Sequence, residues 1–185
     1  MYEEFSMLSE NASEVGISWR GQPKVKRSFF KSSEGFSISG IIWGEGSPQL
    51  VLIHGGAQNA HTWDTVALAL DIPLLAVDLP GHGHSDWRPK CDYTPFVLAT
   101  QVAEAIEHWA PEAEAIVGMS LGGLTAVCIA ADYPQLVKRL GIIDVTPGTD
   151  RDKAEPIINF VSGPEVFESF EEILNRTIEH NPTRS

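Results

Sequence analysis

Short apolar runs that alternate with helical stretches constrain the fold of this chain more than any other feature. Four such runs occur, at 49–53, 73–77, 114–117 and 137–145. Helical periodicity marks the stretches between them, at 61–70, 95–109 and 121–132. Runs that are apolar on both faces are typical of strands in a covered parallel sheet. The β-α-β-α-β-α-β order predicts an α/β fold, with a mostly parallel twisted sheet and helices on both faces.

Different elements are expected at the two ends of the chain. Strands at 25–30 and 36–43, joined by a Ser33-Glu34-Gly35 turn, predict an N-terminal antiparallel hairpin. Acidic amphipathic segments at 150–161 and 165–180 predict helices that pack outside the sheet. We therefore expect three parts: an acidic N-terminal segment (1–20), a core (21–146) and the beginning of a helical cap or lid (147–185).

Composition excludes several classes of protein. The chain has 185 residues, 43% of them hydrophobic and 21% charged, which is typical of a soluble globular domain. Its 25 acids and 13 bases give a formal net charge of −12, which disfavours nucleic acid and anionic membranes as partners. Cys91 and Cys128 are too few for a disulfide framework, and no signal peptide or membrane span is recognisable. A cytoplasmic location is expected.

The segment Gly118-Met119-Ser120-Leu121-Gly122 is the strongest candidate for catalysis. A Gly-x-Ser-x-Gly sequence between a strand and a helix is typical of a nucleophile elbow, in which a strained turn exposes the serine Oγ. The helix that follows points its N-terminal N–H groups towards the same place. The alternative is a turn of small residues that only lets helix and strand pack closely.

A glycine-rich loop, His54-Gly55-Gly56-Ala57, follows the first apolar run. A backbone N–H of this loop, together with that of Leu121, would form the two-donor oxyanion hole that acyl transfer requires. By position, Gly56 is the expected donor and Ala57 the second choice. We expect His54, Gly55, Ala57 and Met119 to line the substrate site.

A second glycine-rich loop, Asp78 to Ser85, follows the next apolar run and contains His82 and His84. Two histidines at this spacing, without a carboxylate pair or a cysteine nearby, make a poor metal site. The favoured interpretation is a shaped loop in which Asp78 and the histidines bond to the backbone. No metal is expected.

Together these motifs resemble the α/β-hydrolase superfamily, in its small-molecule esterase, lipase and C–C hydrolase branch. The resemblance covers about residues 24–146 and rests on the His-Gly-Gly loop, Asp-x-Pro-Gly-His-Gly-x-Ser and Gly-Met-Ser-Leu-Gly-Gly. It implies an eight-stranded, mostly parallel sheet with a cap, and no metal or organic cofactor. Related dehalogenases and epoxide hydrolases carry aspartate at the position of Ser120, so those chemistries are not expected.

The resemblance also implies a catalytic acid after the seventh strand and a base histidine after the eighth. We therefore expect this sequence to be the N-terminal part of a longer hydrolase, without its last strands and its base, which would lie beyond residue 185. Asp144 ends the sixth strand, where some relatives carry the acid; alternatively it caps the turn at Thr146-Pro147. Neither His61 nor His180 matches the base of the family.

The leading hypothesis is a serine hydrolase that cleaves a small acyl ester, with Ser120 and Asp144 as catalytic residues and Gly56 and Leu121 as the oxyanion hole. A non-catalytic small-molecule receptor on the same fold, an acyltransferase and a C–C hydrolase stay open as alternatives. The partner is a small-molecule substrate of unknown identity. The sequence does not indicate an oligomeric state.

Overall fold

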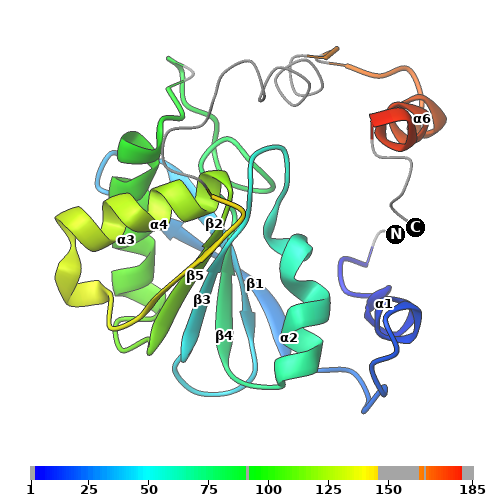
Figure 1. The fold of residues 1–185 in the computed structure, drawn as a ribbon, viewed down its shortest axis with the longest axis horizontal. Helices are drawn as coiled ribbons and strands as arrows, with labels where there is room; N and C mark the ends of the chain where they lie inside the picture. The colour runs from blue at the N-terminus through cyan, green and yellow to red at the C-terminus, as the bar shows by residue number, and fades with distance from the viewer. Residues whose placement is uncertain (1–2, 91, 146–162, 165, 181–185) are drawn as a thin grey trace. The chain divides into compact units, whose positions relative to one another are not determined.

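The computed structural model describes residues 3–90, 92–145, 163–164 and 166–180. Its internal contacts divide the chain into two units, residues 1–145 and residues 146–185. The first unit is built on a six-stranded sheet with the strand order β1-β2-β4-β3-β5-β6 (Figure 1).

The sheet confirms the predicted α/β class. β1 (Val25–Lys31) and β2 (Ser37–Trp43) form the expected antiparallel hairpin, and β2 continues antiparallel to β4. The remaining strands pair in parallel: β3 (Leu50–Ile53), β4 (Leu74–Val77), β5 (Ala115–Met119) and β6 (Leu140–Ile143). The carboxyl ends of these four strands therefore lie at one edge, where α/β proteins place their ligands.

Helices cover both faces of the sheet (Figure 1). α3 (Pro95–Trp109) and α4 (Leu121–Asp132) have the bounds expected from the sequence, and a short 3-10 helix, η2 (Pro134–Leu136), follows α4. They pack on one apolar core with Ile38, Val51 and Ile116. On the other face, η1 (Ala60–Trp63) and α2 (Asp64–Leu70) cover a second core that contains Trp43 and Leu74.

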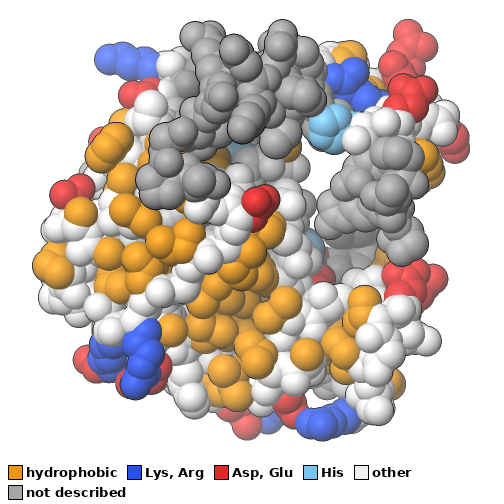
Figure 2. All heavy atoms as spheres, viewed as in Figure 1, with side chains coloured by type: hydrophobic (Ala, Val, Ile, Leu, Met, Phe, Trp, Pro, Cys, Tyr) orange, Lys and Arg blue, Asp and Glu red, His pale blue; other side chains and the backbone are white. Residues whose placement is uncertain are grey.

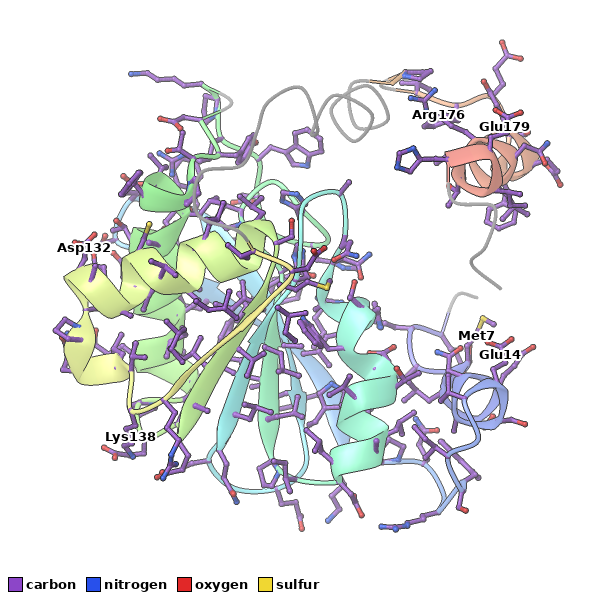
Figure 3. The ribbon with its side chains drawn as sticks, in the orientation of Figure 1. Met7, Glu14, Asp132, Lys138, Arg176 and Glu179 are labelled. Atoms are coloured by element: carbon purple, nitrogen blue, oxygen red, sulfur yellow. The ribbon has the colours of Figure 1, made fainter. Side chains whose placement is uncertain are left out.

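An additional helix, α1 (Leu8–Glu14), lies within the N-terminal segment that the sequence set apart as merely acidic. Met7 and Glu14, labelled in Figure 3, lie beside and at the end of this helix. Leu8 and Ala12 are one turn apart and almost completely buried, and Leu8 belongs to the second core, under α2. The N-terminal segment is thus part of the first unit, where α1 packs against α2.

The second unit is described mainly through α6 (Phe170–His180), which confirms the helix expected within 165–180. Ser169 Oγ accepts a hydrogen bond from the Glu172 N–H (3.2 Å), and the Glu172 carboxylate accepts one from the Glu168 N–H (2.9 Å). This reciprocal arrangement is similar to a capping box and fixes the start of the helix. The helix expected at 150–161 lies outside the described residues.

β6 forms an edge of the sheet, because among the described residues it pairs only with β5. Its Leu140, Ile142 and Ile143 are 37–45% exposed, and Leu124 and Val127 of α4 are similarly exposed. Figure 2 shows apolar side chains gathered over this part of the surface. No helix in the described part of the chain is long and apolar enough to cross a membrane.

Candidate active site

Ser120 lies in a sharp turn between β5 and α4, at the carboxyl edge of the sheet. Its backbone has φ 51° and ψ −118°, in the left-handed range that a non-glycine residue rarely adopts. The Ser120 N–H donates to the Ile143 carbonyl of β6 (2.9 Å), and the Leu124 N–H donates to the Ser120 carbonyl (3.0 Å). The strained serine is therefore held from both sides, and it is exposed.

The glycines on either side of Ser120 are required by close backbone approaches. A Cβ at Gly118 would clash with the backbone of Gly122, and a Cβ at Gly122 would clash with the carbonyls of Ile53 and His54. The elbow therefore packs directly on its own strand and on the end of β3. Glycine, which has no Cβ, is the residue that fits.

The glycine-rich loop after β3 lies against this elbow. A Cβ built on Gly55 would be 3.3 Å from Ser120 Cβ, and one on Gly56 would be 3.8 Å from Leu121 Cδ2. Among the described residues, the N–H groups of Gly56 and Leu121 have no hydrogen-bond acceptor. The N–H of Ala57, the second-choice donor, likewise has no acceptor in the described part of the chain, and Ala57 has φ 58°. The structure thus brings together the groups from which the sequence predicts an oxyanion hole.

Gln58 supports the loop from within, a contact that the sequence analysis did not identify. Its Oε1 accepts a hydrogen bond from the Gly55 N–H at 2.9 Å. A side chain at Gly55 would displace this oxygen. The bond fixes the turn that presents Gly56 next to Leu121.

His54 is completely buried and braces two loops, although the sequence placed it among the residues that line the substrate site. Its Nε2 accepts a hydrogen bond from the Leu79 N–H (3.0 Å), so the proton is on Nδ1, which donates to the Gly55 carbonyl (2.7 Å). Burial lowers the pKa of His54 to about 4, so the ring is neutral near pH 7. Because both ring nitrogens are engaged, a substrate has no access to them.

The other residues expected to line the site differ in exposure. Gly55 is buried, Ala57 is exposed, and Met119 is half-buried against the core under α2. Ala57 is therefore the most accessible of the three.

The loop after β4 is organised by Asp78, as the favoured interpretation predicted. Asp78 is fully buried; one carboxylate oxygen accepts from the Ala60 N–H (2.7 Å), and the other accepts from the His84 N–H (3.1 Å) and the Arg27 guanidinium (2.6 Å). Burial by itself raises the pKa of Asp78, but these hydrogen bonds and the Arg27 charge outweigh it and lower the pKa. Ala60 is the first residue of η1, which follows the glycine-rich loop. Asp78 therefore anchors the chain after this loop, and His54 anchors its beginning.

Arg27 extends this cluster to the N-terminal segment and to α2. It also donates to Ser39 and Glu4. Glu4 and Asp64 each bond one ring nitrogen of His61, at 3.1 and 2.8 Å. The Asp64 hydrogen bond raises the pKa of His61, against the effect of partial burial. His61 is thus occupied by two carboxylates within this network.

Within residues 3–145, described except for residue 91, no histidine ring forms a hydrogen bond with Ser120. Asp144 follows Ile143, the residue that bonds the Ser120 N–H, and has φ 53° and an exposed position. Its place beside the elbow is compatible with a role as the catalytic acid and equally with a role as the cap of the turn that follows. The described residues contain no group of three or more His, Cys, Asp or Glu side chains that could hold a metal ion.

Comparison with known proteins gives a consistent picture. A sequence model of the alpha/beta hydrolase fold matches residues 48–170. Esterase Rv0045c of Mycobacterium tuberculosis is 43% identical over 188 residues, a match that includes 98% of this chain and 61% of the esterase. The crystal structure of that esterase has a TM-score of 0.84, covering 100% of this chain and 62% of its own.

A more distant relative is the pimeloyl-[acyl-carrier protein] methyl ester esterase of Proteus mirabilis, 36% identical over 143 residues. That match includes 74% of this chain and 51% of the esterase. The chain thus spans between half and two thirds of the length of these relatives.

Proposed function

Because this chain belongs to the alpha/beta hydrolase fold family, we propose that it carries the nucleophile and the oxyanion hole of a serine hydrolase that cleaves a small carboxylic ester. The observation that carries the proposal is the backbone of Ser120, strained at φ 51° and exposed at the carboxyl edge of the sheet. A residue in this conformation persists only where the surrounding structure holds it, as at a functional site.

In the proposed reaction, Ser120 Oγ attacks the ester carbonyl carbon and a base takes its proton. The carbonyl oxygen becomes an oxyanion, which the N–H groups of Gly56 and Leu121 bind. The alcohol leaves with a proton from the protonated base, and the acyl group remains on Ser120. Water, deprotonated by the same base, then releases the acid and restores the serine.

The ester class is supported by the relatives, an esterase and a methyl ester esterase in their own names. The net charge of −12 favours a neutral acyl substrate over an anionic one. We propose that the base is a histidine that lies beyond residue 185. Asp144 is proposed as the acid that orients it.

A fluorophosphonate probe tests the nucleophile, since it forms a stable adduct with an activated serine. On the full-length protein, which would contain the proposed base, we expect one adduct, located by peptide mass spectrometry on Ser120 and absent from Ser120→Ala. Ser47→Ala, which removes an exposed serine elsewhere, should label as the parent does. In the same samples, hydrolysis of p-nitrophenyl acetate should depend on Ser120. An adduct at another serine, or equal hydrolysis by Ser120→Ala, would contradict the assignment.

A further inference from the structure

We propose that the opposite edge of the sheet holds a second binding site, which takes a small amphipathic carboxylate. The site is a cavity of about 410 Å³ between the chain at 17–24, the end of β2 and the end of α2. Small-molecule sites commonly have volumes of about 300–1,000 Å³. This inference does not depend on the proposed esterase activity.

The cavity lies at the amino ends of the parallel strands, away from Ser120. Trp43 pairs with Leu74, the first residue of β4, and Pro73 precedes that strand; both Trp43 and Pro73 line the cavity. Ser120 instead follows the last residue of β5. Five strand residues at about 3.3 Å each separate the two edges by roughly 16 Å. A ligand of this cavity therefore does not contact the elbow.

The lining offers an apolar surface for the body of a ligand. Trp43 is 3% exposed and belongs to the core under α2, and its indole Nε1–H has no acceptor among the described residues. The larger of the other apolar side chains in the lining come from the N-terminal chain, α2 and the loop before β4: Ile17, Trp19, Pro23, Leu68, Ile72 and Pro73. Aromatic and aliphatic walls of this kind suit a hydrocarbon chain or a ring.

The rim supplies cations and hydrogen-bond donors. Arg20 binds Asp71 through one nitrogen (2.9 Å), with side chains 78% and 66% exposed, and Lys24 pairs with Glu45. Such exposed pairs contribute little stability, so Arg20 can bind a second carboxylate with its remaining donors. The backbone N–H groups of residues 18–22, all described, have no acceptor within the described part of the chain. Donors at the rim are therefore available.

Charge favours an anionic headgroup at this place, although the whole chain is acidic. Residues 17–24 all line the cavity, and they contain two cations, Arg20 and Lys24, and no Asp or Glu. Asp71 and Glu45 on the rim oppose an anion, but each already faces a cation. An apolar body on the tryptophans with a carboxylate at Arg20 matches both parts of the cavity.

Titration of the ¹⁵N-labelled protein, followed by NMR, tests the proposal with octanoate as the probe. We expect shifts of the Gly21, Gly44 and Ile72 amide signals and saturation by octanoate. Octan-1-ol, which has no charge, and propionate, which has a short chain, should each bind at least about tenfold more weakly. Arg20→Gln should weaken octanoate binding about tenfold, the usual scale for one charge-assisted contact. Arg139→Gln is the matched control, an exposed arginine paired with Glu114 outside the cavity.

Three results would overturn the proposal. Octanoate-induced shifts confined to signals of the elbow and the facing loop, such as Leu121 and Gly56, would place binding at the active site. Equal affinity for octan-1-ol would show that the carboxylate is not recognised. Equal weakening by Arg20→Gln and Arg139→Gln would show that the effect is one of net charge alone. Because no readout uses catalysis, the outcome is separate from that of the phosphonate test.

Discussion

Replacement of His54 by leucine is expected to cost stability in a way that depends on pH. At pH 8 the ring is neutral and bonds the Gly55 carbonyl and the Leu79 N–H. His54→Leu leaves both buried backbone groups without a partner, at about 1–3 kcal/mol each. We therefore expect the variant to lose about 2–6 kcal/mol of unfolding free energy at pH 8.

The wild-type protein should lose part of this advantage in acid. The folded pKa of His54 is about 4, below the ordinary 6.5, so the unfolded chain binds the proton more readily. The contribution is complete above about pH 6.5 and falls as the pH drops towards 4. For these two values, linkage gives a loss of about 2 kcal/mol at pH 5. The variant has no ring to protonate, so its deficit should narrow by that amount.

Urea unfolding at pH 8 and pH 5, followed by tryptophan fluorescence, measures both effects. When the unfolding free energy of the variant is subtracted from that of the parent at each pH, the contributions of groups that titrate in both proteins cancel. His84→Gln, in which an exposed histidine is replaced, should stay within about 0.5 kcal/mol of the parent at pH 8. If the loss of unfolding free energy in His54→Leu were the same at pH 8 and pH 5, His54 would not be a neutral, buried residue that holds the two loops together.

Three further substitutions test the site and its support. Gly122→Ala should lower the unfolding free energy by more than about 3 kcal/mol, beyond ordinary overpacking, because its Cβ would meet the His54 carbonyl; urea unfolding measures this. Arg27→Met should cost about 3–5 kcal/mol, since it leaves the Asp78 carboxylate buried and unpaired, and addition of Asp78→Asn should restore part of the loss. Ser120→Gly should abolish phosphonate labelling yet raise the unfolding free energy by about 1 kcal/mol, because glycine relieves the strain at φ 51°.

Features with a local signature could be predicted from the sequence. The bounds of α3 and α4 were predicted to the residue, because Pro95 opens the first and the elbow opens the second. The turn at Ser120 was predictable because close backbone approaches leave room only for glycine at both flanking positions. The seven-residue α1 was missed, since it has no side-chain cap and shows only Leu8 and Ala12 as buried residues.

Contacts between distant segments could not be predicted. Arg27 and Asp78 are 51 residues apart, and their pairing depends on β2 lying between β1 and β4. The role of His54 depends equally on Leu79, which belongs to the neighbouring strand-end loop. A single sequence shows the residue types but not which of them meet, so a buried brace and a substrate contact are indistinguishable for His54 before the fold is known.

Among the described residues β6 has one unpaired edge, which has a consequence for how these residues, taken alone, would behave at high concentration. An unpaired strand presents a row of N–H and C=O groups that can pair with the same strand of a second molecule, and neighbouring side chains would then cover part of the exposed Ile142 and Ile143. Charged residues that would oppose this pairing lie only next to the two ends of β6: Lys138 and Arg139 before the strand and Asp144 after it. Self-association through β6 is therefore the route by which these residues, taken alone, would begin to aggregate, and a lysine at Ile142 is the first change to make against it.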